Sequence, residues 1–435
     1  MSDLTLSPIP APFRATFTPP GSKSLTNRAL VLASLARGQT VLSNVLFADD
    51  TEVMMAGLEK LGHRLEVDRN SSTVTVHGGP IGVDHAEIFC GNSGTTIRFL
   101  AALVSHAKGT FRLDGVARMR QRPIKELVNL LRNLGVRVTY DLNEGFPPIT
   151  IQADGLAGGI LKFSSAVSSQ YLSSVLMVAP YARHEVHVEL EGPQTSWPYI
   201  SMTMRMMDHF DITPELVRDP ATGQPKKIVV AQGQYRATPY AIEPDASNAS
   251  YFFAAAAINP GAKVTIEGLG RYSLQGDVAF ADLLHKMGAN LIFGKDFITV
   301  QGTDMLEGID VDLVDMPDMA QTLAVTALFA SGPTTMRGLH TLRVKETDRI
   351  AALAAELAKL GARVEVEDAA MTIHPPDRIR PAAIETYEDH RMAMSFAIAT
   401  TRAAGITIKN VECVNKTYPN FFEDFGRVTN SVMQR

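Results

Sequence analysis

The feature that most constrains the fold is a recurring phrase: an apolar helix end, then Leu or Met, then Gly, then an alternating apolar strand. A glycine in that place is typical of a left-handed helix cap. Gly62 and Gly135 lie 73 residues apart, as do Gly288 and Gly361, and one offset of 226 residues carries the first pair onto the second. We interpret this shared offset as an internal duplication of the chain.

The duplication predicts three modules in each half. A weaker copy of the phrase, Met206–Ile212, lacks the glycine but falls where a third module of the first half belongs. Modules of roughly 75 residues exceed the solenoid repeats, which favours small α/β units packed around a core. Prolines at 239–244 and 19–20 predict two crossings between the halves, and a cleft between α/β domains is a predicted ligand site.

Composition excludes several classes of protein. The formal net charge of -5 leaves no broad basic surface for nucleic acid or membrane, so any cationic site must be local. Cys90 and Cys413 are too few for a disulfide framework, and His184 and His187 would face opposite sides of a strand rather than share a metal. No apolar run approaches the ~18 residues that span a bilayer. We expect a metal-free cytoplasmic protein.

Three segments rich in Gly or Ser precede apolar helical stretches, where free backbone N–H groups favour an anion. In the first, both Lys23 and Arg28 could reach a ligand above the first helical turn. Ser22 replaces the glycine of a P-loop, so ATP use is unsupported. The second, Gly91–Arg98, allows close backbone approach, and the third, Ser164–Tyr171, offers hydroxyl groups. An ordinary helix cap is the alternative for the last two.

Two cationic clusters, Arg118–Pro123 and Arg343–Ile350, occupy matching places in the two halves, because the offset of 226 carries Ile124 onto Ile350. A solvated helix surface is the usual explanation of mixed charge. Arginine forks bind carboxylate and phosphate bidentately, however, so a ligand carrying both groups would require several of them. The matched positions favour such a ligand.

Helical spacing gives a more detailed expectation for the second cluster. Lys345 and Arg349, four residues apart, are predicted to share a helix face toward the cleft, with Glu346 pointing elsewhere on that helix. Two later segments, 388–392 and 415–419, each add one cation. His390 is interpreted as structural, since no Gly-x-Ser-x-Gly nucleophile motif precedes its Asp-His pair.

Taken together, the motifs resemble the signature set of 5-enolpyruvylshikimate-3-phosphate synthases over residues 20 to 420. None is decisive alone, but their order across both halves is specific. The matching motifs are Pro-Gly-Ser-Lys-Ser with Asn27–Leu30, Gly-Asn-Ser-Gly-Thr, Arg118–Met119 with Arg122–Pro123, Ser-Ser-Gln, Arg-Val-Lys-Glu-Thr-Asp-Arg and Asp-His-Arg-Met.

The resemblance implies an α/β fold of two similar domains, each of three βαβαββ units, joined by a two-strand hinge. Residues 21–240 would form the N-terminal domain on the shikimate 3-phosphate side, and residues 1–20 with 241–435 the second, with the active site in the cleft between them. It implies a monomer that needs no cofactor.

The resemblance also implies a reaction and its residues. The enolpyruvyl group of phosphoenolpyruvate would pass to the 5-hydroxyl of shikimate 3-phosphate through a tetrahedral intermediate, releasing phosphate, in the pathway to chorismate and aromatic amino acids. Asp318 would be the base, and Glu346 or Lys23 would protonate the methylene carbon. Shikimate 3-phosphate would contact Lys23, Ser24, Arg28, Ser168, Ser169, Gln170, Ser196, Tyr199, Asp318 and Lys345. Phosphoenolpyruvate would contact Lys23, Gly94, Arg122, Gln170, Arg349, Arg391 and Lys416, with Arg98 in support.

Several positions qualify this transfer. Asp318 has a second interpretation as a helix N-cap. Because Met319 lies 226 residues after Ser93, Asp318 also opens the second half's counterpart of the Asn-Ser-Gly loop. Thr341 stands where some members have a substrate-binding Asn, and Phe99 follows Arg98 where others have Pro. A glycine at position 94 predicts that the phosphoenolpyruvate site has room for glyphosate. Phe99 is expected to alter the loop that contains Gly94, so it also affects that prediction.

Three rivals have distinct signatures. The related transferase acting on UDP-N-acetylglucosamine would show a Lys-Asn pair near the start and a loop cysteine, whereas Gly21–Ser24 occupies that place and Cys90 is expected to be buried. A noncatalytic binding protein would have lost Asp318, Glu346 or Lys23. An RNA-end-processing relative would need a basic face and a nucleotide-accepting histidine.

Overall fold

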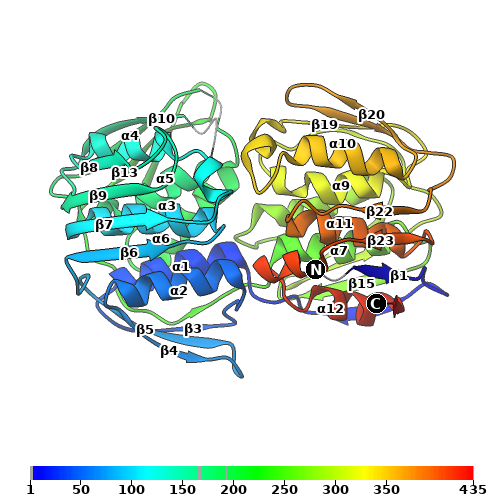
Figure 1. The fold of residues 1–435 in the computed structure, drawn as a ribbon, viewed down its shortest axis with the longest axis horizontal. Helices are drawn as coiled ribbons and strands as arrows, with labels where there is room; N and C mark the ends of the chain where they lie inside the picture. The colour runs from blue at the N-terminus through cyan, green and yellow to red at the C-terminus, as the bar shows by residue number, and fades with distance from the viewer. Residues whose placement is uncertain (1–2, 165–167, 193, 435) are drawn as a thin grey trace. The chain divides into compact units, whose positions relative to one another are not determined.

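The computed structural model describes residues 3–164, 168–192 and 194–434. The chain divides into two compact units, Gly21–Ile242, called the N-terminal unit here, and Met1–Pro20 with Glu243–Arg435, called the C-terminal unit. Each contains three four-stranded sheets with their helices (Figure 1). The chain therefore passes twice between the units, at Pro20–Gly21 and at Ile242–Glu243.

The N-terminal unit holds three βαβαββ modules. In each sheet the first two strands run parallel, and the fourth strand pairs antiparallel with both the second and the third. The first module comprises β14 (Tyr240–Ala241), α1 (Lys23–Leu35), β3 (Gly38–Ser43), α2 (Asp49–Lys60), β4 (Arg64–Asp68) and β5 (Thr73–Gly78). The second comprises β6 (His85–Phe89), α3 (Gly94–Ser105), β7 (Lys108–Asp114), α4 (Lys125–Asn133), β8 (Arg137–Tyr140) and β9 (Ile149–Asp154). The third comprises β10 (Gly159–Phe163), α5 (Ser169–Val178), β11 (Val186–Leu190), α6 (Trp197–His209), β12 (Glu215–Arg218) and β13 (Pro225–Val230).

The C-terminal unit repeats the same plan. Its first module comprises β2 (Arg14–Phe17), α7 (Ala246–Ala257), β15 (Lys263–Glu267), α8 (Phe280–Lys286), β16 (Asn290–Phe293) and β17 (Phe297–Gln301). The second comprises β18 (Asp310–Asp312), α9 (Ala320–Ala327), β19 (Thr334–Arg337), α10 (Arg349–Lys359), β20 (Arg363–Val366) and β21 (Met371–His374). The third comprises β22 (Ala382–Ile384), α11 (His390–Thr400), β23 (Ile406–Ile408), α12 (Phe421–Thr429), β24 (Met433–Gln434) and β1 (Leu4–Leu6). Short 3-10 turns include η1 (Met119–Gln121), η4 (Pro317–Met319), η5 (His340–Val344) and η6 (Val411–Lys416).

The opening strand of each unit comes from a distant part of the chain. Strand β14 pairs in parallel with β3, and β2 pairs in parallel with β15. Each unit therefore completes its first sheet with the strand that leads into or out of a crossing. The six matched modules confirm the prediction of an internal duplication.

The helix-end glycines confirm the predicted left-handed caps. Gly62, Gly135, Gly288 and Gly361 have φ values of 90°, 88°, 109° and 100°. After α6, where the phrase lacks glycine, Asp211 takes the same conformation at a φ of 73°. Asp tolerates this region better than most residues, which explains how the third module keeps the turn.

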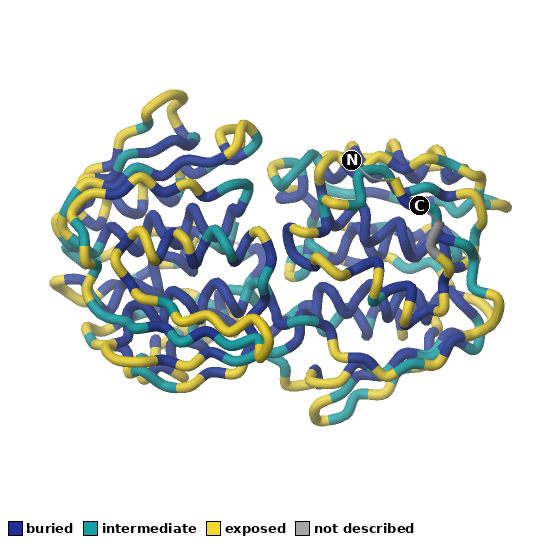
Figure 2. Tube along the Cα trace, turned by 60° about the horizontal axis from the view of Figure 1, so that its bottom comes forward, coloured by how far each residue is buried: buried dark blue, intermediate teal, exposed yellow. Residues whose placement is uncertain are grey.

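The first helix of every module lies in the core of its unit. All residues of α3, α7, α9 and α11 are buried, and α1 and α5 are nearly so (Figure 2). A helix that is apolar all round belongs in an interior, and its first N–H groups then need a partner at the point where it begins. Among the described helices, none has the length and hydropathy that crossing a membrane requires.

Candidate active site

Serine side chains cap the three central helices of the N-terminal unit. The Oγ atoms of Ser22, Ser93 and Ser168 each accept a hydrogen bond from a backbone N–H two or three residues ahead, at 3.2 to 3.5 Å. The alternative interpretation of the second and third segments as helix caps is therefore confirmed for Ser93 and Ser168. Residues 165–167 of the serine-rich segment lie outside the described residues. Capping by a neutral hydroxyl leaves the positive end of each helix without a negative side chain at the cap.

Arg28 lies on α1 with 1% of its surface exposed. Its Nε donates to Thr203 Oγ1 at 2.7 Å and its Nη1 to the Ser24 carbonyl at 2.9 Å. Its Nη2 donates to Ser173 Oγ and the Tyr199 carbonyl, both at 3.3 Å. All four partners are neutral, and burial lowers the pKa of Arg28 to about 10. A buried guanidinium held in this way favours an anionic ligand.

The aromatic ring of Phe99 supports Arg28 from α3. Phe99 is fully buried, and the guanidinium carbon of Arg28 lies 5.2 Å from its ring centroid. This is within the range of a cation–π interaction. The residue that departs from the family pattern is thus in contact with a predicted ligand-binding arginine.

Gly94, at the start of α3, lies directly beside two arginines. A Cβ at this position would be 2.7 Å from Arg122 and 2.8 Å from Arg98, so a larger residue would displace a guanidinium. Arg98 donates to the side-chain oxygen of Gln170, which fixes both groups. Arg122 donates to the Asn92 carbonyl at 2.9 Å. The structure thus brings these candidates together around the first turn of α3.

Lys23 has an acidic neighbour that the sequence analysis missed. Its Nζ lies 3.3 Å from the Asp50 carboxylate on α2, and Asp50 is nearly buried. Ser169 is buried in the first turn of α5. Ser196 occupies the N-cap position of α6 with a left-handed φ of 56° and no side-chain capping hydrogen bond, one turn before the Tyr199 carbonyl that contacts Arg28. The acidic pair Asp49-Asp50 at the start of α2 could have drawn attention to Asp50. Its contact with Lys23 joins two different helices, so the sequence alone does not predict it.

In the C-terminal unit, three cations surround Asp318. The carboxylate lies 3.0 Å from Arg349, 3.4 Å from Lys345 and 3.1 Å from Arg391. Asp318 belongs to η4, and α9 has its N-cap at Met319, so the interpretation of Asp318 as the capping residue is wrong. The side chain keeps 20% exposure, which leaves the carboxylate accessible.

Arg349 pairs with several carboxylates. It donates to both oxygens of Asp389, at 2.7 and 3.2 Å, and to Glu346 at 3.0 Å. Burial lowers the pKa of Arg349, but the charges of Asp389, Glu346 and Asp318 outweigh that effect and raise it above its ordinary value. Lys416 lies 3.9 Å from the other oxygen of Glu346. The fully buried Asp389, which accepts two of these hydrogen bonds, holds Arg349 in place.

The prediction that Lys345 and Arg349 share one face of a helix is wrong. Helix α10 begins only at Arg349, because the Asp348 side chain accepts from the Ala351 N–H at 3.1 Å and caps it there. Lys345 has extended backbone. Glu346 does not point elsewhere, since it accepts a hydrogen bond from Arg349. The Asp348 cap makes the helix begin later in the chain than charge spacing suggested.

Three other predicted positions are interior. Cys90 is fully buried, as expected, and burial raises the pKa of its thiol above the ordinary value. Thr341 is buried in η5. His390 has 1% exposure at the start of α11, with Nδ1 3.6 Å from Asp389.

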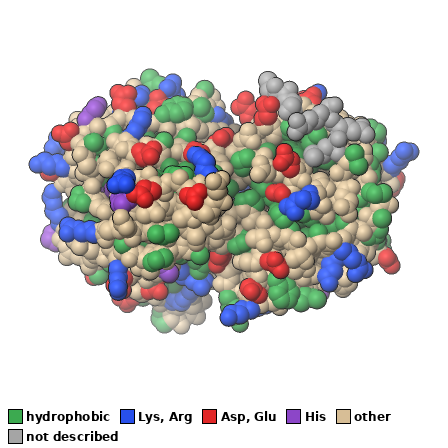
Figure 3. Space-filling model, turned by 90° about the horizontal axis from the view of Figure 1, so that it is seen from below, with side chains coloured by type: hydrophobic (Ala, Val, Ile, Leu, Met, Phe, Trp, Pro, Cys, Tyr) green, Lys and Arg blue, Asp and Glu red, His purple; other side chains and the backbone are tan. Residues whose placement is uncertain are grey.

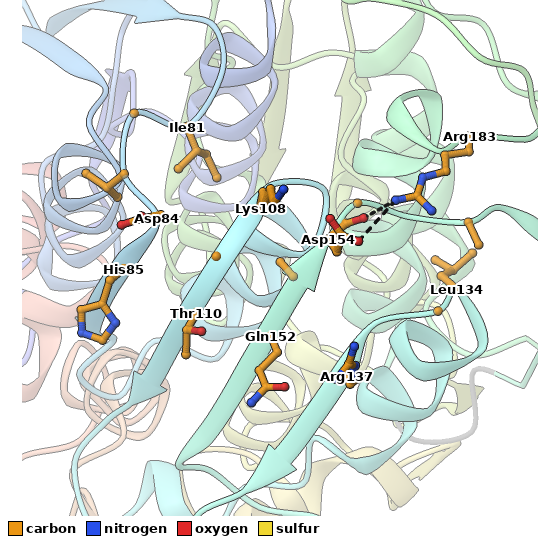
Figure 4. Close-up of a pocket in the computed structure, with 17 residues that line it drawn as sticks. Ile81, Asp84, His85, Lys108, Thr110, Leu134, Arg137, Gln152, Asp154 and Arg183 are labelled. Atoms are coloured by element: carbon orange, nitrogen blue, oxygen red, sulfur yellow. Dashed lines mark hydrogen bonds and ion pairs between the residues drawn. The ribbon is translucent and has the colours of Figure 1, made fainter.

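A large surface pocket lies away from the candidate residues. It has a volume of about 1350 Å³ and is lined by side chains of β6, β7, β8 and β9, including His85, Thr110, Arg137 and Gln152 (Figure 4). An ion pair between Asp154 and Arg183 stands at one end. None of the candidate residues is among those that line it.

The six βαβαββ modules, three in each unit, define an enolpyruvyl transferase fold. The sequence profile of EPSP synthase (3-phosphoshikimate 1-carboxyvinyltransferase) matches residues 8–425. The 3-phosphoshikimate 1-carboxyvinyltransferase of Shewanella denitrificans is 44% identical over 99% of both chains, and that of a Sulfurovum species is 44% identical over 97% of this chain and 98% of the relative. A solved EPSP synthase structure from Acinetobacter baumannii superimposes with a TM-score of 0.81 at 26% identity, covering both chains fully. The chain belongs to the EPSP synthase family.

The Arg349 cluster predicts a large effect on stability. Replacing Arg349→Met leaves buried Asp389 and Glu346 without their shared cation, so the free energy of unfolding should fall by about 3–5 kcal/mol. Arg343→Met, which removes a partly exposed pair with Asp348, should cost only about 0–1 kcal/mol. Urea denaturation of both variants measures the difference, and equal losses would contradict the anchoring role of Arg349.

Proposed function

We propose that this protein transfers the enolpyruvyl group of phosphoenolpyruvate to the 5-hydroxyl of shikimate 3-phosphate, giving 5-enolpyruvylshikimate 3-phosphate and phosphate. This step belongs to the shikimate pathway to chorismate and aromatic amino acids. The observation that carries the assignment of roles is the accessible Asp318 carboxylate between three cations. Both substrates carry carboxylate and phosphate groups, which is the chemistry these side chains recognise.

We assign most contacts with shikimate 3-phosphate to residues 21–240, as the N-terminal domain. Arg28 supports this assignment because its buried charge has neutral partners and gains from an anion. The serine caps lie at helix starts, where N–H groups and hydroxyls suit a phosphate. The proposed contacts are Lys23, Ser24, Arg28, Ser168, Ser169, Gln170, Ser196 and Tyr199, joined by Asp318 and Lys345 from residues 241–435.

Phosphoenolpyruvate is assigned to cations of both units. Gly94 supports this assignment because the absence of a Cβ keeps the space beside Arg122 open. Arg98 would hold Gln170 in position rather than touch the ligand. The proposed contacts are Lys23, Gly94, Arg122, Gln170, Arg349, Arg391 and Lys416.

The chemistry follows from these assignments. Asp318 would take the proton of the 5-hydroxyl group as the hydroxyl oxygen bonds to C2 of phosphoenolpyruvate. At the same time, Glu346 or Lys23 would give a proton to the methylene carbon. Inorganic phosphate then leaves the tetrahedral intermediate, and the group that protonated the methylene carbon takes back one methyl proton, which restores the double bond. When the anions of phosphoenolpyruvate engage Arg349 and Arg391, Asp318 loses part of its ion pairing and is left to accept the proton.

We also propose that the protein acts as a monomer in the cytoplasm and binds no nucleic acid. On the face drawn in Figure 3, basic and acidic side chains are interspersed, in keeping with the formal net charge of -5. Such a surface supports recognition of small anions at local sites rather than of a polyanion.

The proposed reaction predicts a strict substrate requirement. Phosphate should be released only when shikimate 3-phosphate and phosphoenolpyruvate are supplied together, without added metal or nucleotide. A coupled phosphate assay with each substrate omitted in turn checks this. Turnover with UDP-N-acetylglucosamine in place of shikimate 3-phosphate would refute the assignment.

The base role of Asp318 predicts a split between turnover and binding. Asp318→Asn keeps the size of the side chain but cannot take a proton, so kcat should fall by at least about 100-fold. The KM values should change far less, and steady-state kinetics in both substrates measures this. A variant with near-normal kcat and greatly raised KM would remove Asp318 from the base role.

The contact of Phe99 with Arg28 predicts a specific loss of affinity. Phe99→Leu removes the ring under the guanidinium, so KM for shikimate 3-phosphate should rise about fivefold. KM for phosphoenolpyruvate should stay nearly constant. Phe111→Leu, at a fully buried ring on β7, controls for lost packing and should leave both KM values near wild type. Equal effects of the two substitutions on KM would contradict the prediction.

A further inference from the structure

Glu356 is a fully buried carboxylate on α10 that the proposed chemistry does not use. Its Oε2 accepts from Lys359 Nζ at 2.6 Å and from the Glu385 backbone N–H at 3.0 Å. Its Oε1 accepts from the Tyr387 hydroxyl at 2.7 Å. A buried carboxylate persists only when such partners compensate the loss of water. Two of its three partners belong to one segment, 385–388.

That segment holds an unusual backbone conformation. Tyr387 and Glu388 are consecutive non-glycine residues with φ values of 54° and 55°. Side chains with a Cβ rarely adopt this left-handed region, and strain of this kind persists only where surrounding contacts impose it. The hydrogen bonds of Glu356 supply two such contacts.

The strained segment leads directly into the candidate active site. Asp389 follows Glu388, accepts from the Arg391 N–H at 2.9 Å and caps α11. It also accepts the two hydrogen bonds from Arg349. The direction of the Asp389 and Arg391 side chains therefore depends on the turn that precedes them.

Arg349 and Glu356 lie seven residues apart, which places them on one face of α10, two turns from each other. Both are tied to the segment 385–389, Arg349 through Asp389 and Glu356 through Glu385 and Tyr387. Helix α10 thus holds this segment at two points. One point includes a proposed ligand contact, and the other is remote from it in sequence.

We infer that Glu356 is a positioning residue, which holds the turn 385–388 and thereby sets Asp389 and Arg391 for phosphoenolpyruvate. Its assignment to that substrate rests on the function proposed above. Tyr387 supports it as the donor, since burial, together with its hydrogen bond to Glu356, raises the pKa of Tyr387 to about 12 and keeps the hydroxyl protonated at neutral pH.

Kinetics in both substrates tests the inference. Glu356→Gln should raise KM for phosphoenolpyruvate about tenfold, because a carboxylate with three donors becomes an amide that cannot satisfy them all. KM for shikimate 3-phosphate, whose proposed contacts lie mainly in the N-terminal unit, should change less than about twofold. Tyr387→Phe, at a half-exposed position that endangers folding little, should raise KM for phosphoenolpyruvate about threefold.

Leu353→Ala is the matched control. Leu353 is fully buried on the same helix, and its hydrocarbon side chain can make no hydrogen bond to the segment 385–388. It should lower stability while leaving the ratio of the two KM values unchanged. An unchanged ratio in both Glu356→Gln and Tyr387→Phe, or an equal change in Leu353→Ala, would overturn the inference.

Hydrogen–deuterium exchange separates this inference from the proposed reaction, because it needs no substrate. Backbone amides of 385–391 should exchange faster in Glu356→Gln than in wild type. In Leu353→Ala, the exchange of these amides should rise only as much as the lower global stability of that variant predicts. Unaltered exchange in Glu356→Gln would overturn the positioning role even if turnover is normal. Absence of wild-type turnover with accelerated exchange would refute only the proposed function.

Discussion

The buried ion pair between Arg349 and Asp389 is the interaction on which the site of the C-terminal unit depends. Asp389 has no exposed surface and Arg349 has 1%, so neither charge is solvated by bulk water and each depends on the other for compensation. Both are bound to other parts of the site, Arg349 to Asp318 and Glu346, and Asp389 to the start of α11. One pair thus fixes the relative positions of η4, α10 and α11.

The two units cap their buried helices with side chains of different charge, neutral in one unit and negative in the other. Each buries its first helices, whose starting N–H groups must be satisfied at the positions where ligand residues gather. The N-terminal unit caps α1, α3 and α5 with neutral serines, whereas the C-terminal unit caps α7 and α11 with Asp245 and Asp389. Neutral caps leave positive helix ends that suit an anion, whereas the acidic cap Asp389 also holds Arg349 in place.

Local features were predictable from the sequence, and tertiary ones were not. The glycine phrase predicted the helix ends and the duplication, because a left-handed cap depends on one residue and its neighbours. The same spacing logic failed for Lys345 and Glu346, since the Asp348 cap rather than charge spacing decides where α10 begins. Asp50 was missed because its partner Lys23 lies on another helix, a contact that no spacing in the sequence encodes.

Arg28 and Arg349 show how two equally buried arginines come to have different roles. Arg349 is surrounded by carboxylates, which raise its pKa, so its charge is already compensated and it serves mainly to hold the site together. The partners of Arg28 are hydroxyl and carbonyl oxygens, and burial lowers its pKa to about 10. An arriving anion therefore relieves an electrostatic cost at Arg28, whereas at Arg349 it must compete with carboxylates in place. From the ligand contacts proposed above, we therefore expect Arg28 to contribute more to ligand affinity and Arg349 more to the geometry of the site.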